Sequence, residues 1–358
     1  MRAVQSTERP FGKTGNFTRK KAEIWYDSGV GIDSNLSILV TGGTGSFGKK
    51  FVETLLKGTP PRKLIVFSRD ELKQHEMRMQ GYNAVCMRYF IGDVRDKDRL
   101  RRAMSDVDIV VHAAALKHVH ACEYNPIEAI QTNIIGAQNI INAAIDAGVK
   151  KVLALSTDKA VNPVNLYGAS KLCAEKLFVQ SNAYSRPEGP VFSCVRYGNV
   201  IGSRGSVIPS FMEQRKTGTV TITDERMTRF WLSVEQGVDF VLKCLSLMRG
   251  GEIFVPKIPS TRLIDLVEAV APGCKHVTTG IRPGEKLHEC LLSDEEVRHT
   301  VELADMYVIE PEDESWGFKH WEGKRPKENW RYSSDTNAEK LSPEQWRALL
   351  KDAALADA

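Results

Sequence analysis

Short runs of apolar residues recur along the first two hundred residues of the chain. They are LSILV (36–40), KLIVF (63–67), MRYFI (87–91), VDIVV (107–111), KVLAL (151–155) and VFSCV (191–195). Each run is bounded by turn residues, which is typical of buried parallel strands. Helical stretches separate the runs. This alternation predicts an α/β fold built on a doubly wound parallel sheet of the Rossmann type.

The clearest helical stretch is 126–147. Asn125 is a candidate N-cap, Pro126 suits the first turn, and Glu128 can reach back as in a capping box. Gly148 follows as a stop signal. Five of its isoleucines form one apolar stripe, made of Ile127, Ile130, Ile134, Ile141 and Ile145.

Changes in composition divide the chain into four parts. Gly and Pro become frequent after about residue 200, in GSRGSVIP, FVPKIPS and IRPGEK, and four of the six tryptophans follow residue 311. We therefore expect the end of the chain to pack on the body. The four parts are a polar, poorly ordered arm (1–34), a dinucleotide-binding core (35–200), a smaller substrate lobe with segments that return to the core (201–338), and a tail (339–358). A partner-binding role for the arm is the alternative.

Composition and charge exclude several classes of protein. The 358 residues are 42% hydrophobic and 26% charged, which is ordinary for a globular protein. No apolar stretch is long enough to span a membrane, and the N-terminus does not resemble a secretory signal. The seven scattered cysteines predict a reducing cytosol. The net charge of +4 is too small and too evenly spread to indicate nucleic-acid binding.

A glycine loop follows the first predicted strand and opens the first predicted helix. LVTGGTGSFGKKF carries glycines at Gly42, Gly45 and Gly48. Such spacing closes a tight turn and lets the backbone approach a pyrophosphate, which then meets N–H groups at the helix N-terminus. The loop stands at the head of a βαβαβ series, so it predicts a dinucleotide cofactor.

The end of the second strand indicates which dinucleotide is bound. NAD-binding chains usually place an acidic residue there for the ribose 2′-hydroxyl. Here VFSRDELK offers Arg69 and Lys73, which can neutralise a 2′-phosphate, and this favours NADP. The adjacent Asp70 keeps NAD as an alternative. Asp93, after the third strand, is expected near the adenine. The full set of predicted cofactor contacts is Gly42, Thr44, Gly45, Ser46, Phe47, Gly48, Ser68, Arg69, Asp70, Lys73, Asp93, Val94, Ala113, Ala114, Lys117, Tyr167, Lys171 and Val200.

The segment LALSTDKAVNPVNLYGASK (153–171) carries the candidate catalytic groups. Tyr167 and Lys171 lie four residues apart and therefore share one helix face. A nearby ammonium and a positive nicotinamide lower the pKa of a tyrosine and make it a usable base. After a nucleotide-binding fold, this pair is typical of the short-chain dehydrogenases. Asp158 and Lys159, at the end of the preceding strand, add an acid and a base, although a solvated loop would also carry such charges.

Longer stretches resemble one particular family. They are TGGTGSFGK, FSRDELKQ, IGDVRD, HAAALKHV, STDKAVNPVNLYGASKL, RYGNVIGSRGSV, ITDERMTRFW, GGEIFVPKIPS and GIRPGEKLHE, with a weaker YSSDTN at 332–337. The chain is similar to the inverting UDP-N-acetylglucosamine 4,6-dehydratases that begin pseudaminic acid synthesis for flagellin glycosylation. Retaining dehydratases carry Asp-Glu where this chain has Asp158-Lys159, and membrane-anchored relatives often have Met in place of Tyr167. The arm at 1–34 is longer than the family needs.

The resemblance implies roles for further residues and a mechanism. Tyr167 would take the O4 proton, Lys159 the C5 proton, and Asp158 would protonate the departing O6. We expect burial, the neighbouring Lys117 and Lys171 and the cationic nicotinamide to lower the pKa of Lys159, and Asp158 to raise it unless Asp158 is itself protonated. The resemblance also implies a cytoplasmic homo-oligomer, a hexamer, acting on UDP-N-acetylglucosamine. The predicted substrate contacts are Lys117, Asn199, Arg204, Val207, Arg229, Arg282 and Asn337.

Three alternatives stay open on the sequence. A sugar-nucleotide 4-epimerase would use the same fold, Tyr167 and Lys171, but would need no acid–base pair for elimination. A catalytically silent NADP-binding regulator would need neither the Tyr167/Lys171 pair nor the acid–base pair. His118, His120 and Cys122 alternate like metal ligands on a strand. We read them instead as part of a loop after the fourth strand, and we predict no metal site.

Overall fold

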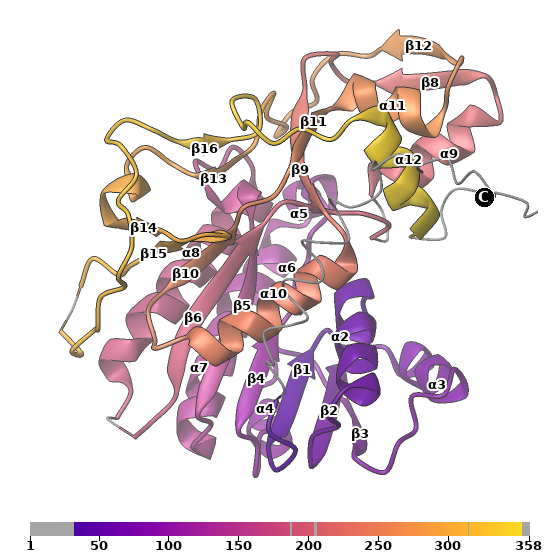
Figure 1. Ribbon diagram of the computed structural model, residues 1–358. Coiled ribbons are helices and arrows are strands. Elements are labelled where there is room, and N and C mark those ends of the chain that lie inside the picture. The colour runs from indigo at the N-terminus through magenta and orange to yellow at the C-terminus, as the bar shows by residue number, and fades with distance from the viewer. Residues whose placement is uncertain (1–31, 187, 204–205, 314, 353–358) are drawn as a thin grey trace, which may run out of the picture.

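A nine-stranded sheet forms the centre of the protein (Figure 1). The computed structural model describes residues 32–186, 188–203, 206–313 and 315–352. The strands of the large sheet are β1 (Ser37–Thr41), β2 (Lys63–Ser68), β3 (Met87–Ile91), β4 (Ile109–His112), β5 (Lys151–Thr157), β6 (Val191–Tyr197), β10 (Ile253–Pro256), β14 (Thr300–Glu302) and β15 (Met306–Ile309). Their order is β14-β15-β10-β6-β5-β4-β1-β2-β3.

All six predicted strands are confirmed, as β1 to β6. These strands and β10 run parallel to their neighbours, and β15 and β14 then add an antiparallel edge. Every residue of β1 and β4 is buried, whereas the edge strand β3 exposes part of its surface. Covered on both faces, the central strands consist of continuous apolar runs rather than alternating ones. The predicted doubly wound α/β fold is confirmed.

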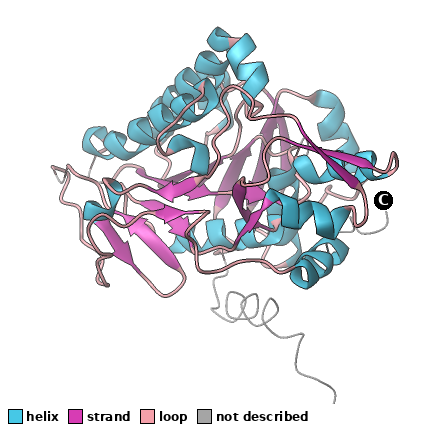
Figure 2. Ribbon diagram, turned by 90° about the horizontal axis from the view of Figure 1, so that it is seen from above, coloured by secondary structure: helices cyan, strands magenta, loops and turns pink. Residues whose placement is uncertain are grey.

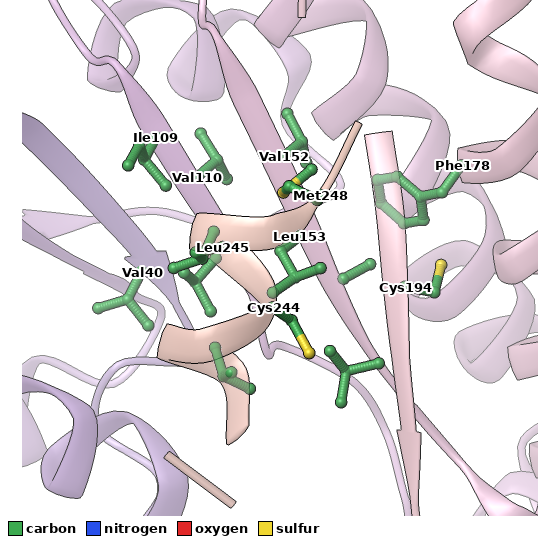
Figure 3. Packing of buried hydrophobic residues seen from close by; sticks show 14 of the residues in the cluster. Val40, Ile109, Val110, Val152, Leu153, Phe178, Cys194, Cys244, Leu245 and Met248 are labelled. Atoms are coloured by element: carbon green, nitrogen blue, oxygen red, sulfur yellow. The ribbon is translucent and has the colours of Figure 1, made fainter. Parts of the chain in front are cut away.

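Helices cover both faces of this sheet (Figure 1). They are α2 (Ser46–Lys57), α3 (Glu71–Met79), α4 (Lys97–Ala103), α5 (Val119–Tyr124), α6 (Pro126–Ile130), α7 (Gly136–Ala147), α8 (Leu166–Gln180) and α10 (Val234–Leu247). In Figure 1, α10 and α2 lie in front of the sheet and α4, α7 and α8 lie behind it. Cys244 and Leu245 of α10 pack in one core with Val40 of β1 and Leu153 of β5 (Figure 3). None of the helices in the described residues is long and apolar enough to cross a membrane.

The helix predicted at 126–147 differs from expectation at its start. It consists of α6, a π-helical turn at Gln131–Ile135, and α7. The Asn125 side chain does not cap it; its amide donates to the Ala121 carbonyl oxygen. Glu128 accepts from the Arg95 guanidinium at 2.7 Å rather than from the helix end.

The π turn also changes which face of this helix is buried. Ile127 is 64% exposed, although the stripe of isoleucines predicts that it faces the core. A π turn inserts an extra residue, which rotates the residues before it relative to those after it. Asn133, within the turn, is buried and bonds to the Leu116 backbone and to Ser170 on α8. Gly148 ends α7 in the left-handed conformation, as predicted.

A smaller lobe lies above the carboxyl ends of the strands (Figures 1 and 2). It contains three small sheets, β11-β9-β7, β12-β8 and β13-β16. Their strands and the helices around them are β7 (Asn199–Val200), β8 (Thr219–Ile222), β9 (Thr228–Leu232), β11 (Ser260–Arg262), β12 (Lys275–Thr278), β13 (Cys290–Leu292), β16 (Tyr332–Ser333), α9 (Val207–Arg215), α11 (Leu263–Val270) and α12 (Pro343–Asp352). Short turns complete the described elements: η2 (Asp158–Ala160), η3 (Ser181–Tyr184) and η4 (Glu296–His299).

The lobe has its own hydrophobic core, centred on two tryptophans. Trp346 of α12 is fully buried and packs edge-on against Trp231 of β9, with 5.1 Å between ring centroids. Its indole N–H donates to Thr261 Oγ1 at 3.1 Å. Truncating a buried tryptophan typically costs about 3–5 kcal/mol. Helix α12 is therefore held on the lobe through Trp346, as the tryptophans after residue 311 predict.

Candidate active site

The glycine loop joins β1 to α2. A Cβ at Gly42, whose φ is +66°, would lie 2.9 Å from the Ala114 backbone nitrogen. A Cβ at Gly48 would lie 2.4 Å from Gly43 Cα. Gly45 precedes the first residue of α2 and supplies no side chain to cap that helix end. The loop thus offers close backbone approach beside a helix N-terminus, which fits the pyrophosphate of a dinucleotide.

We predict that Gly48→Ala weakens dinucleotide binding by about 10- to 100-fold. The added methyl group forces α2 away from the loop at a cost of about 1–3 kcal/mol, and each 1.4 kcal/mol is about tenfold in Kd. Titration with NADP, followed by intrinsic fluorescence, measures the effect. Gly237→Ala in α10 is the matched control, because its Cβ would lie an ordinary 3.6 Å from Leu232 Cδ1. Equal Kd values for the two variants would contradict the prediction.

A cleft of about 630 Å³ extends from this loop along the carboxyl ends of the strands. Ligands of open α/β sheets bind at this edge. All the residues predicted to contact the dinucleotide line the cleft, from Gly42 in the loop to Val200 in β7. Thr157, Lys159 and Asn199 line the same cleft. The structure thus brings the predicted cofactor contacts together with the candidate catalytic groups.

One end of the cleft holds the residues expected to choose between NADP and NAD. Asp70 caps α3 by accepting from the Lys73 backbone N–H at 2.9 Å, and its other oxygen pairs with the Lys73 ammonium. Arg69 is half exposed, and its Nη1 lies 3.4 Å from Asp93 Oδ2. The carboxylate of Asp70 is therefore engaged by its own helix, while the Arg69 guanidinium makes a long contact with Asp93.

The candidate acid and base lie where β5 passes into η2. Thr157 Oγ1 donates to Asp158 Oδ1 at 2.9 Å, and Lys159 Nζ donates to the same oxygen at 3.1 Å. Asp158 is fully buried, and its Oδ2 has no hydrogen-bond partner among the described residues. Thr157 and Lys159 line the cleft, whereas Asp158 does not. The solvated-loop alternative is therefore wrong for Asp158.

The charges of this pair differ from expectation. Burial raises the pKa of Asp158, although the Lys159 ammonium acts in the opposite direction, and the carboxylate of Glu289 adds to the rise. Burial by itself would lower the pKa of Lys159, but Asp158 and Glu289 outweigh it and raise that pKa. Our expectation of a lowered pKa of Lys159 is wrong, because Asp158 raises this pKa more than the neighbouring lysines lower it, and the carboxylate of Glu289, which the expectation did not include, adds to the rise.

Tyr167 and Lys171 project from α8 into the cleft. Burial raises the pKa of Tyr167 to about 12, and the cation that most opposes this rise is Lys159 rather than Lys171. The Lys171 ammonium donates to the Leu155 carbonyl oxygen at 2.6 Å, and burial lowers its pKa. The protein's own groups therefore favour the phenol form of Tyr167. A positively charged nicotinamide beside the ring would act in the opposite direction.

Glu289 is a site residue that the sequence reasoning missed. It is 2% exposed, and its Oε1 lies 3.2 Å from Lys159 Nζ. Burial would raise the pKa of Glu289, but Lys159, Arg229 and Lys286 outweigh it and hold that pKa below its usual value. Its motif, GEKLHE, contains ordinary surface residues, so nothing in its local pattern indicates that it returns to η2.

The predicted substrate contacts separate into two groups. Lys117 and Asn199 line the cleft. Arg229, Arg282, Val207 and Asn337 do not. Arg229 is buried, and its guanidinium donates to the carbonyl oxygens of Thr228, Lys286 and Leu287. Arg204 lies outside the described residues.

The arginines of two further motifs lie in different environments. Arg282 is exposed on the loop that precedes β13. Arg196, in RYGN, is fully buried and pairs with Glu175 at 2.6 Å and Glu296 at 2.9 Å. This network joins α8, β6 and η4, so Arg196 is a structural residue. Asn337 likewise donates to the backbone carbonyl oxygens of Ile258 and Glu339.

The alternating residues His118, His120 and Cys122 lie on or next to α5, and not in a loop as expected. His118 precedes the helix and Cys122 is buried within it. Within the described ranges, no three His, Cys, Asp or Glu side chains gather closely enough to hold a metal ion.

Comparison with known proteins adds to this geometry. Residues 38–311 match the model of a family described as polysaccharide biosynthesis protein. The chain belongs to this family. Relatives in the family include the UDP-N-acetylglucosamine 4,6-dehydratase (inverting) of Campylobacter jejuni serotype O:2, which is 54% identical over 311 residues, covering 84% of this chain and 93% of the relative. The resemblance indicated by the motifs is confirmed.

The chain is also similar to other named relatives and to solved structures. A protein named UDP-glucose 4-epimerase from Rickettsia typhi is 44% identical over 282 residues, covering 76% of this chain and 82% of the relative. The crystal structure of Pen from Bacillus thuringiensis matches with a TM-score of 0.81 and 38% identity, over 89% of this chain and 99% of that one. DesIV of Streptomyces venezuelae, a dTDP-glucose 4,6-dehydratase with NAD and TYD bound, has a TM-score of 0.63 and 26% identity, over 70% of this chain and 87% of that chain.

Proposed function

We propose that the chain is a UDP-N-acetylglucosamine 4,6-dehydratase that inverts C5 of the sugar. The observation that carries the proposal is the Asp158–Lys159 pair at the end of β5, next to the cleft that Tyr167 and Lys171 line. Oxidation at C4 alone needs only the tyrosine, the lysine and a hydroxyl group. A buried acid joined to a cleft-lining amine supports an elimination as well. The names of the relatives that are 52–54% identical support the same assignment.

The residues of the cleft fit NADP as the cofactor. The glycine loop suits the pyrophosphate, and Arg69 suits a 2′-phosphate. When bound, NADP supplies the acceptor for the C4 hydride and the donor that returns this hydride to C6. The reaction is therefore redox-neutral, and the sugar loses one water overall.

The protein side chains move the protons. Tyr167 takes the O4 proton as C4 is oxidised, and the new 4-keto group acidifies the C5 hydrogen. Lys159 takes the C5 proton. Asp158 supplies the proton with which O6 leaves as water, and the Thr157 hydroxyl, which lines the cleft and is hydrogen-bonded to Asp158, passes it on. C5 is then protonated from the face opposite Lys159, which inverts its configuration. Each positioned acid or base typically contributes a factor of about 10²–10⁴.

Lys159 must be neutral to act as a base, and its contact with Asp158 gives its extra proton an acceptor. Its ammonium lies 3.1 Å from Asp158 Oδ1. Transfer of one proton from Lys159 to Asp158 produces both required forms at once, a neutral amine and a protonated carboxyl. Because burial raises the pKa of Asp158, this carboxyl is a suitable acceptor for that proton.

Only some of the predicted substrate contacts line the cleft. Lys117 and Asn199 line the cleft and are proposed to contact the substrate directly. Arg204, Val207, Arg229, Arg282 and Asn337 stay predictions from the family resemblance. We further propose that the enzyme works in the cytoplasm as a homo-oligomer, a hexamer, and that its product enters pseudaminic acid synthesis for flagellin glycosylation.

A UDP-sugar 4-epimerase is the second candidate, because relatives 44% identical carry that name. An epimerase product retains O6, whereas the dehydratase product has lost water. Incubation with UDP-N-acetylglucosamine, followed by mass spectrometry and NMR of the product, separates the two functions. Loss of one water would support the dehydratase, and an unchanged mass with a new C4 configuration would support the epimerase. Turnover of any UDP-sugar would exclude a silent NADP-binding regulator.

We predict that the protein binds NADP more tightly than NAD and that Arg69→Ala removes most of this preference. A guanidinium that meets a 2′-phosphate contributes a charge-assisted hydrogen bond worth about 1.5–3 kcal/mol, or about 10- to 100-fold in Kd. Titration of both variants with both cofactors measures it. Arg101→Ala, an exposed position on α4, is the control. A wild-type preference for NAD would contradict the prediction.

A further inference from the structure

The Glu289 side chain enters the active site from a distant part of the chain. Both backbone groups of Glu289 are held by Ser334: its N–H donates to Ser334 Oγ at 2.9 Å, and its carbonyl accepts from the Ser334 N–H at 2.8 Å. Three residues earlier, the Lys286 ammonium donates to the Val161 carbonyl oxygen at 2.5 Å, just beyond η2. These contacts hold the Glu289 carboxylate against Lys159, the proposed base.

The surroundings of the Lys159 amine constrain its direction. Its nitrogen lies 3.1 Å from Asp158 Oδ1 and 3.2 Å from Glu289 Oε1. A neutral primary amine has two N–H donors and one lone pair in a tetrahedral arrangement. If each carboxyl oxygen accepts one N–H, the lone pair occupies a remaining direction. Lys159 lines the cleft, and neither carboxyl group does.

We propose that Glu289 is a positioning residue for the C5 proton transfer: with Asp158 it holds the two N–H groups of the Lys159 amine and thereby aims the lone pair into the cleft. This inference rests on the proposed dehydratase function and adds to it a residue that acts through Lys159. Glu289 does not itself touch the substrate, because it lies behind the cleft wall.

The charge of Glu289 has a second, measurable consequence. The charged and titratable groups around Glu289 and Lys159 are Asp158 on η2, Tyr167 on α8, Arg229 on β9, and Lys286 and His288 on the segment before β13. The negative charge of Glu289 raises the pKa of both Asp158 and Lys159. Asp158 is active below its pKa and Lys159 above its pKa. Removing the charge therefore moves both limbs of the pH profile of water loss to lower pH.

Two variants of Glu289 separate its effect on the direction of the Lys159 lone pair from the effect of its negative charge. Glu289→Ala removes the acceptor and the charge, and we expect C5 proton exchange and water loss to fall about 100-fold, as misaligned catalytic groups typically do. C4 oxidation and the KM for UDP-N-acetylglucosamine should change little. Glu289→Gln keeps an acceptor oxygen and removes the charge. It should recover most of the C5 exchange and move the pH profile to lower pH. Exchange is read from deuterium at C5 in D₂O, and oxidation from transient absorbance of the reduced cofactor.

Glu296→Gln is the matched control, because it removes a carboxylate from the Arg196 network outside the cleft. We expect it to lower the thermal midpoint without moving the pH profile. A parallel fall of oxidation, exchange and water loss in both Glu289 variants would reduce Glu289 to a structural residue and overturn the proposal. So would a Glu289→Gln enzyme with the wild-type pH profile. If wild-type protein releases no water from UDP-N-acetylglucosamine, the proposed dehydratase function fails instead. Failure of the Glu289 proposal can thus be distinguished from failure of the proposed function.

Discussion

Tyr167→Phe is expected to abolish C4 oxidation, lowering turnover by about 10⁴-fold, the upper end of what one positioned acid or base contributes. The phenol oxygen is the group proposed to take the O4 proton, and a phenyl ring cannot replace it. Binding of UDP-N-acetylglucosamine should stay near normal, because the ring itself is retained. In a single turnover the variant should show no transient absorbance of the reduced cofactor.

Tyr184→Phe provides the control for this experiment, since Tyr184 is 70% exposed at the end of η3 and outside the cleft. The pKa of Tyr167, raised to about 12 by burial, adds a pH prediction. The phenolate is the active form, so hydride transfer should increase with pH until Tyr167 is ionised. An unchanged hydride-transfer rate in Tyr167→Phe would mean that another group takes the O4 proton.

Lys159→Ala is expected to leave C4 oxidation intact and to stop the elimination of water. Without the amine there is no base for the C5 hydrogen, and water loss should fall by about 10³-fold. The variant should therefore accumulate the reduced cofactor and a 4-keto sugar that still carries O6. Lys176→Ala, on the exposed side of α8, is the control.

Reaction in D₂O tests both steps at C5, the removal of its proton and its reprotonation. Wild-type enzyme should give a 4-keto-6-deoxy sugar of L-arabino configuration with deuterium at C5, and Lys159→Ala should show no exchange there. A D-xylo product would refute the inversion at C5. Unimpaired exchange in Lys159→Ala would remove Lys159 from the role of base, and Glu289 would then have no amine to aim.

Part of this protein could be predicted from short stretches of sequence. The six strands, the glycine loop and the Tyr167/Lys171 pair all rest on residues within a few positions of each other. A buried parallel strand needs a continuous apolar run, and a phosphate-binding turn needs glycines at set spacing. These local requirements leave a mark in the sequence, so the fold and the lining of the cleft could be predicted.

The tertiary structure alone decided the features that depend on distant contacts. The π turn at Gln131–Ile135 exposes Ile127 despite its place in an apolar stripe. The guanidinium of Arg229, a predicted substrate contact, donates to three backbone carbonyl oxygens of the lobe.

The charge of Lys159 is the clearest case. From burial and the neighbouring lysines, a lowered pKa is expected, but Asp158 and, to a smaller extent, Glu289, 130 positions further along the chain, raise it instead. Electrostatic effects depend on distance in space and on burial, and neither can be read from spacing along the chain. The sequence by itself therefore determined the fold and the residues that line the dinucleotide part of the cleft. The packing of the lobe on the sheet decided which predicted substrate contacts reach the cleft and how Asp158 and Lys159 are charged.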